Sequence, residues 1–118
     1  GYILVIDDEE VIRTSAKITL EDMGYEVALA SDGEKGVAAF EAEHDRINLV
    51  ILDMIMPKLG GIDTFRALRK IDPEARIIIA SGFSKGDSIN TLKQEGLLGF
   101  ISKPYRRTEL EQLLAEVM

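Results

Sequence analysis

The chain has 118 residues, of which 46% are hydrophobic, carries a net charge of −7 and contains no cysteine. The length and the hydrophobic fraction suit one domain with a substantial core, which we expect to span residues 1–118. The acidic balance argues against direct nucleic-acid binding. The absence of cysteine and the single histidine exclude disulfides, thiolate metal sites and multi-histidine metal sites. No apolar stretch approaches the ~20 residues of a membrane span and no signal peptide is visible, so we expect a cytoplasmic protein without membrane contacts.

Predicted strands and helices alternate along the whole chain. In chain order, we predict a strand at 2–6, a helix at 9–23, a strand at 26–30, a helix that follows Ser31-Asp32-Gly33, a strand at 49–52, a helix at 62–71, a strand at 76–80, a helix at 87–95, a strand at 99–102 and a helix at 108–117. Within the helices, apolar residues recur every three to four positions. Gly24 and Gly96 suit the ends of two of these helices.

The first, third and fourth predicted strands are continuous apolar runs, which is typical of a parallel sheet that helices cover on both faces. Regular alternation of strands and helices predicts a doubly wound (βα)5 fold of the α/β class, with right-handed crossovers. Ligands of such folds bind beyond the carboxyl ends of the strands, at the point where the strand order reverses.

Polar residues follow four of the five strands at this edge: Asp7-Asp8, Asp53, Ser81 and Lys103. Two carboxylates ~4 Å apart repel by roughly 4 kcal/mol at an effective dielectric near 20, so such a cluster must take up a proton or a cation. Ligands that are all oxygen atoms favour Mg²⁺. Asp8 also suits the N-cap of the first helix, and the two roles are compatible.

Asp53 has the chemistry of a phosphate acceptor, since an aspartate carboxylate can attack phosphorus and form an acyl phosphate. Lys103 and the Ser81 hydroxyl can then bind the phosphoryl oxygens. A cis peptide bond at Lys103-Pro104 would aim the ammonium group back across the strand ends, which is a hypothesis at this point. Taken alone, each of these residues is an ordinary strand-end or surface residue.

The ordered set resembles the receiver domains of two-component response regulators over essentially the whole chain. The matching residues are Asp7-Asp8, Asp53 with Met56-Pro57 and Gly60-Gly61, Ser81-Gly82 and Lys103-Pro104. The resemblance implies a flavodoxin-like strand order of 2-1-3-4-5. It also implies that Asp53 accepts a phosphoryl group from a phosphohistidine on a histidine kinase or histidine phosphotransfer protein.

The resemblance further implies a set of roles for single residues. Mg²⁺ or Mn²⁺ would be held by Asp8, Asp53 and the backbone carbonyl of Ile55, with Asp7 assisting through water, while Ser81 and Lys103 bind the phosphoryl oxygens. Ser81 and Phe100 would form the conformational switch. The surface of the fourth helix, fifth strand and fifth helix would bind the output partner, and a homodimer could form through the same surface. Ile55 and Phe83 stand where family members tune phosphate lifetime, and because both are apolar we expect slow self-dephosphorylation.

Other interpretations fit the sequence less well. A haloacid dehalogenase-type phosphatase needs an Asp-x-Asp motif, but Asp7 and Asp8 are adjacent. A flavodoxin-like cofactor binder needs a loop that cradles phosphate, not an acidic one. A binding module that has lost phosphorylation remains an alternative, although all the chemical positions are intact. His44 lies in a charged stretch and is interpreted as a surface residue. The chain is either a stand-alone receiver or part of a longer regulator or hybrid sensor histidine kinase.

Overall fold

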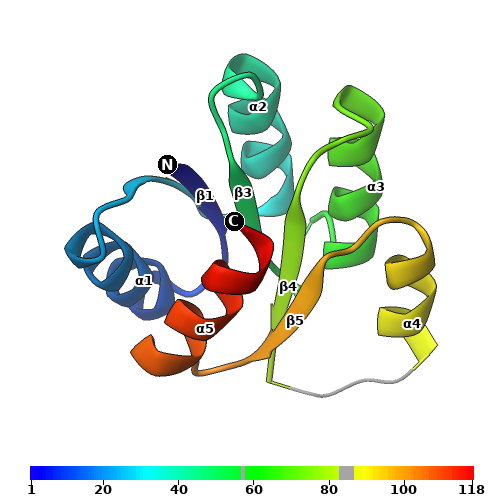
Figure 1. The fold of residues 1–118 in the computed structure, drawn as a ribbon. Coiled ribbons are helices and arrows are strands. Elements are labelled where there is room, and N and C mark those ends of the chain that lie inside the picture. The colour runs from blue at the N-terminus through cyan, green and yellow to red at the C-terminus, as the bar shows by residue number, and fades with distance from the viewer. Residues whose placement is uncertain (57, 83–86) are drawn as a thin grey trace.

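A parallel sheet lies between two layers of helices in the computed structural model, which describes residues 1–56, 58–82 and 87–118 (Figure 1). The elements are β1 (Tyr2–Ile6), α1 (Glu10–Asp22), β2 (Glu26–Ala30), α2 (Gly33–Glu43), β3 (Leu49–Asp53), α3 (Gly61–Ile71), β4 (Ile77–Ser81), α4 (Asp87–Gln94), β5 (Gly99–Ser102) and α5 (Arg107–Val117). Their order is the one predicted, and their ends lie within about one residue of the predicted ends. Of the helices in the described part of the chain, none is long and apolar enough to cross a bilayer.

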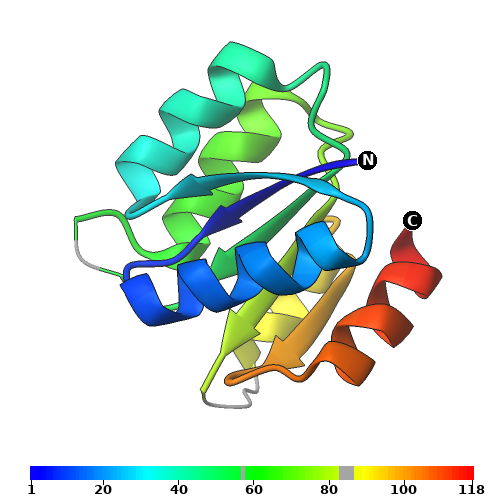
Figure 2. The same cartoon turned by 90° about the vertical axis from the view of Figure 1, so that its left-hand side faces the viewer.

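The strand order is β2-β1-β3-β4-β5 and every pairing is parallel, which confirms the flavodoxin-like prediction. In Figure 2 the strand arrows all point toward the same side of the molecule. The chain moves outward from β1 to β2 and then returns to place β3 on the other side of β1, so the order reverses between β1 and β3. The carboxyl ends of these two strands therefore flank the crevice in which doubly wound folds bind their ligands.

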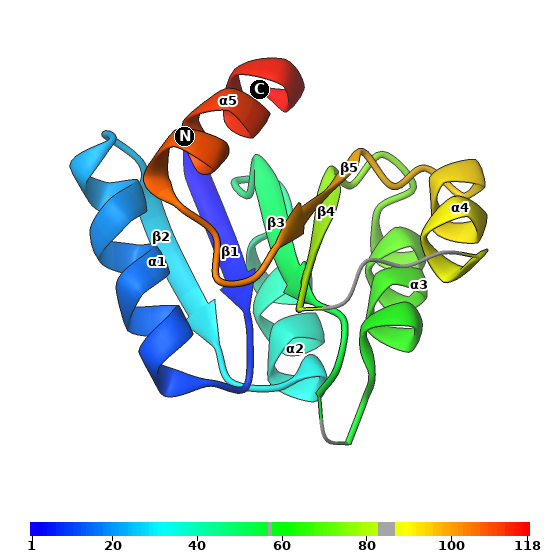
Figure 3. The same ribbon diagram turned by 90° about the horizontal axis from the view of Figure 1, so that it is seen from below.

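Two separate cores fill the faces of the sheet, and Figure 3 shows from below the helices that cover each face. On one face, Phe40 of α2 and Phe65 of α3 pack with residues of α4 against the strands. On the other face, Leu20 of α1 and Leu110 of α5 pack against the opposite side chains of the same strands. Every residue of β3 and β4 is buried, which explains why these strands read as unbroken apolar runs.

Gly61 fixes the turn between β3 and α3. A Cβ placed on Gly61 would lie 2.7 Å from both the Cα and the carbonyl oxygen of Met54, and neither of these backbone atoms can give way. The Gly61 N–H donates to that same carbonyl oxygen at 2.9 Å. This close approach needs glycine, and it holds the segment that follows Asp53 against the start of α3.

The two chain ends lie side by side at the amino edge of the sheet (Figure 2). A Cβ placed on Gly1 would lie 3.0 Å from the Cε atom of Met118. The Tyr2 N–H donates to the Asn48 side chain at 2.7 Å, which ties the start of β1 to the residue before β3.

Candidate functional site

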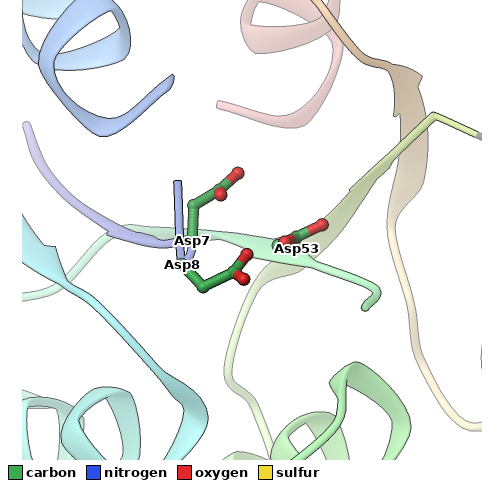
Figure 4. Close-up of side chains that lie close together, drawn as sticks. All are labelled: Asp7, Asp8 and Asp53. Carbon is green, nitrogen blue, oxygen red and sulfur yellow. The ribbon is translucent and has the colours of Figure 1, made fainter. Parts of the chain in front are cut away.

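Three carboxylates meet where β1 and β3 end (Figure 4). Asp7 and Asp53 are buried, Asp8 is exposed, and one oxygen of each lies within 4.8 Å of the others. The strands deliver them because Ile6 of β1 pairs with Leu52 of β3, so that the residues that follow these two positions share one edge of the sheet. The predicted cluster of Asp7, Asp8 and Asp53 is therefore present.

The acidic turn after β1 is held by hydrogen bonds that Asp7 makes through its backbone and its side chain. The Asp7 N–H donates to the Ala30 carbonyl at 3.1 Å, and one Asp7 carboxylate oxygen accepts from the Glu9 N–H at 2.9 Å. The Arg13 guanidinium donates to the Asp7 carbonyl at 2.7 Å. These contacts hold Asp7 in place, and none of them involves the exposed side chain of Asp8.

Asp8 does not cap the first helix, although its position in the sequence suits that role. Helix α1 begins at Glu10, so its N-cap is Glu9, and no side chain makes the cap hydrogen bond. Asp8 lies one residue before the N-cap position. The residue at the N-cap position is the one whose side chain accepts from the N–H two or three positions later. The Asp8 carboxylate lies beside those of Asp7 and Asp53.

Lys103 crosses the strand ends to reach the acidic cluster. Its side chain is 10% exposed, and its Nζ atom lies 3.0 Å from Asp7 Oδ2 and 3.3 Å from Asp53 Oδ1. A third carboxylate oxygen, Oε1 of Glu9, lies 2.9 Å from the same Nζ. The Lys103 N–H donates to the Ser81 carbonyl at 2.8 Å. The Lys103-Pro104 peptide bond is cis, in agreement with the hypothesis from the sequence.

The electrostatics of the site favour cation binding. Burial, followed by the charge of Asp7, raises the pKa of Asp53 from 3.8 to about 7, against the opposing effect of Lys103. Burial lowers the pKa of Lys103, but its hydrogen bonds to Glu9 and Asp7 outweigh this and leave that pKa raised. The lysine therefore stays protonated, and the site holds one ammonium group and the four carboxylates of Asp7, Asp8, Glu9 and Asp53. This excess of negative charge, on ligands that are all oxygen atoms, fits Mg²⁺ or Mn²⁺.

An open cleft of about 570 Å³ lies over these groups. Its lining residues are Asp8, Glu9, Ile12, Asp53, Ile55, Ser81, Gly82, Lys103 and Pro104. Ser81 is buried at the end of β4, and the Ile55 side chain is 61% exposed at the rim. The cleft therefore combines a charged floor with an apolar rim.

The remaining residues singled out from the sequence lie elsewhere. Phe100 of β5 is half-buried against the core that α2, α3 and α4 form with the sheet. His44 follows α2, where its ring centroid lies 6.0 Å from that of Phe40 and its Nδ1 lies 3.3 Å from an Asp45 carboxylate oxygen. Neither residue lines the cleft. Phe83 lies outside the described residues.

Sequence reasoning missed two residues near the site. Glu9 was given no role at the site, yet its carboxylate contacts a residue 94 positions away. Tyr105 has a buried hydroxyl group with no hydrogen-bond partner within the described part of the chain. Burial, followed by the charge of Asp7, raises the pKa of this tyrosine. No local pattern in the sequence signals the contact of Glu9 or the burial of the Tyr105 hydroxyl.

The chain matches a known protein family over nearly its whole length. The family model of the response regulator receiver domain matches residues 3–115. A probable transcriptional regulator, ycf27 of Porphyridium aerugineum, is 39% identical over 116 residues, which are 98% of this chain and 47% of that protein. The CAI-1 autoinducer sensor kinase/phosphatase CqsS of Vibrio cholerae is 38% identical over 111 residues, which are 92% of this chain and 16% of that protein. The chain thus spans less than half the length of either relative.

Solved structures resemble the whole chain. A response regulator receiver domain protein from Clostridium thermocellum is 37% identical with a TM-score of 0.89, and the match covers 99% of this chain and 93% of that one. The CheX–CheY–BeF₃–Mg²⁺ complex of Borrelia burgdorferi matches at 27% identity and a TM-score of 0.94, over 98% of this chain and 87% of that one. The receiver domain of the sensor histidine kinase PA1611 from Pseudomonas aeruginosa PAO1, with magnesium coordinated in its active-site cleft, matches at 26% identity and a TM-score of 0.87, over 98% and 95% of the two chains.

Proposed function

Since the chain belongs to the response regulator receiver domain family, we propose that Asp53 accepts a phosphoryl group from a phosphohistidine on a histidine kinase or histidine phosphotransfer protein. The observation that carries this proposal is the position of Asp53, whose Oδ1 lies 3.3 Å from Lys103 Nζ beside two further carboxylates. One Asp53 oxygen attacks phosphorus as the P–N bond of the donor breaks, and the imidazole leaves with the electron pair of that bond and takes a proton. The product is an acyl phosphate on Asp53.

The neighbouring residues serve this transfer in different ways. Asp8, Asp53 and the backbone carbonyl of Ile55 would hold Mg²⁺ or Mn²⁺, with Asp7 acting through water, and the ion would offset the charge that develops on the phosphoryl oxygens. Lys103 donates a charge-assisted hydrogen bond to one of these oxygens. The Ser81 hydroxyl, at the end of the adjacent strand, donates to another.

The acyl phosphate then changes the surface that partners recognise. Phosphorylation adds nearly two negative charges, which draw the Ser81 hydroxyl toward Asp53. Phe100 lies one strand away on β5, half-buried, and its ring follows into the space that Ser81 leaves. The altered surface consists of α4, β5 and α5, and it would bind the output partner or a second copy of the chain. A two-state element biased by a local charge is the usual form of such a switch.

Phosphorylation of Asp53 can be tested directly. Incubation with acetyl phosphate and Mg²⁺ is expected to add one phosphate per chain, labile to hydroxylamine as an acyl phosphate is, and the Asp53→Asn variant is expected to gain none. Asp63→Asn makes the same change at an exposed position of α3 and should behave as the parent does. Label on Asp53→Asn at the parent level would overturn the proposal, and continuous release of inorganic phosphate would indicate a phosphatase instead.

A long-lived acyl phosphate is expected from the apolar rim. Ile55 lines the cleft and offers no polar group to orient an attacking water. Replacing Ile55 with asparagine should shorten the half-life of the phosphorylated chain by about tenfold. This factor is smaller than the ~10²–10⁴-fold rate increase that a positioned side chain contributes in general acid–base catalysis. Loss of label over time after removal of the donor measures this rate.

The matched control is Ile18→Asn, which changes an exposed isoleucine of α1 outside the cleft. Equal half-lives for the Ile55 variant and this control would contradict the expectation. Phe83, the second position expected to affect the lifetime, lies outside the described residues.

A further inference from the structure

Glu9 sits where a phosphoryl oxygen would bind. On the basis of the function proposed above, we infer that the Glu9 carboxylate competes with the phosphoryl group for Lys103 and so slows the loading of Asp53. Its Oε1 lies 2.9 Å from Lys103 Nζ, closer than either Asp7 at 3.0 Å or Asp53 at 3.3 Å. Glu9 also lines the cleft through which a donor must approach.

The Glu9 side chain has no evident structural task in its own helix. Glu9 is the N-cap of α1, but its side chain makes no cap hydrogen bond. The contacts that anchor this residue use its backbone, since its N–H donates to Asp7 and its carbonyl accepts from the Arg13 N–H at 3.0 Å. The carboxylate instead reaches 94 positions along the chain to Lys103.

The geometry of Lys103 makes this contact a competition. An ammonium group has three N–H donors, and three carboxylates surround this one. A phosphoryl oxygen that binds Lys103 must displace one of them. Asp7 and Asp53 are 2% and 5% exposed, and both are fixed at strand ends, whereas the Glu9 side chain is 60% exposed and free to rotate into solvent. Glu9 is therefore the partner that leaves.

The Glu9 carboxylate slows the loading of Asp53 in two ways. An incoming phosphodonor is anionic, and it meets the charge of Glu9 at the mouth of the cleft before it reaches Asp53. The donor then has to break the contact between Glu9 and Lys103. An ion pair with one exposed partner is weak, so its removal should accelerate loading only about twofold to fivefold. An effect of this size tunes the response and does not decide whether the site works.

Glu9→Gln provides the test, because it keeps the length of the side chain and removes its charge. At saturating Mg²⁺, its second-order rate constant for labelling by acetyl phosphate should exceed that of the parent by about twofold to fivefold. The concentration of beryllofluoride, a phosphoryl mimic, that half-saturates the Mg²⁺-bound chain should fall by a similar factor, and calorimetric titration measures this without any turnover.

Two further variants separate contact from charge and from folding. Glu10→Gln removes the same charge one residue later, at a position that lines the outer face of α1 and not the cleft, and it should match the parent in both assays. Glu9→Asp keeps the charge but shortens its reach to Lys103, so it too should load faster than the parent. Because an aspartate at an N-cap suits the helix, this variant keeps the test valid if the glutamine variant folds poorly.

The outcomes distinguish this inference from the proposed function. If the parent is labelled on Asp53 but Glu9→Gln and Glu9→Asp load no faster than Glu10→Gln, competition by Glu9 is wrong and the phosphoacceptor function stands. If the parent gains no phosphate and binds no beryllofluoride, both proposals fall together.

Discussion

The Asp53→Asn variant is expected to be more stable than the parent chain above pH 7 when divalent cations are absent. Burial and the charge of Asp7 raise the pKa of Asp53 from 3.8 to about 7 in the folded chain. The folded state therefore holds a proton on Asp53 over a pH range in which the unfolded state has already lost it. The stability that this proton contributes is complete below about pH 4 and is lost as the pH rises through 7.

The size of this effect follows from the two pKa values. The difference between about 7 and 3.8 corresponds to up to about 4 kcal/mol of unfolding free energy. Asparagine has nearly the same shape as aspartate and carries no charge. The Asp53→Asn variant should therefore keep its unfolding free energy as the pH rises. Urea unfolding in EDTA at pH values from 4 to 9 is the measurement, with the two chains similar at the acid end and furthest apart at the alkaline end.

A matched control separates the buried carboxylate from a general charge effect. Asp63→Asn changes an exposed aspartate of α3, so its stability should follow that of the parent at every pH. If the Asp53 and Asp63 variants show the same dependence on pH, Asp53 does not carry a raised pKa in the folded chain. Added Mg²⁺ should reduce the difference in stability between Asp53→Asn and the parent. The cation binds the folded state of the parent and not its unfolded state, and this binding stabilises the parent.

Removal of the Lys103 ammonium should have the opposite effect. Lys103→Met keeps an unbranched chain but leaves the buried carboxylates of Asp7 and Asp53 without their cation. Breaking a buried ion pair from one side costs about 3–5 kcal/mol, so we expect a loss of this order at pH 8 in EDTA. Lower pH should restore part of it, because a proton on Asp53 removes one of the charges left unpaired.

Lys17→Met is the control for this second prediction. Lys17 pairs with Glu21 on the surface of α1, where both side chains are more than 40% exposed, and such a pair contributes at most about 1 kcal/mol. The double variant Lys103→Met, Asp53→Asn should lose much less than Lys103→Met alone, since the two changes remove both sides of one contact. A Lys103 variant no less stable than the Lys17 variant would mean that the ammonium does not offset the buried charges.

Much of this architecture could be predicted from local patterns. The unbroken apolar runs before Asp7 and Asp53 are long enough to be strands and too short to be helices, and each helix has an apolar stripe or a glycine stop. Parallel strands then oblige residues at their carboxyl ends to meet, which is why Asp7, Asp8, Asp53 and Lys103 could be grouped in advance.

Other features depend on geometry that no short stretch of sequence encodes. The start of α1 lies one residue later than expected, and this alone removed Asp8 from the N-cap. The contact of Glu9 with Lys103 depends on two long side chains and on the packing of five strands. Lys58 adopts a positive φ of 69° although glycines stand at positions 60 and 61, so the residue type gave no sign of where the turn would bend.

The adjacent chain ends have a consequence for how this domain can be joined to others. Gly1 and Met118 lie at the amino edge of the sheet, a strand length away from the acidic cleft, and this length is roughly 17 Å for five residues. A neighbouring domain or a surface anchor attached at either end would therefore leave the opposite edge, where the acidic cleft lies, accessible. The same proximity makes the fold suitable for circular permutation, because a short bridge could join the old ends while new ones are opened in an exposed loop.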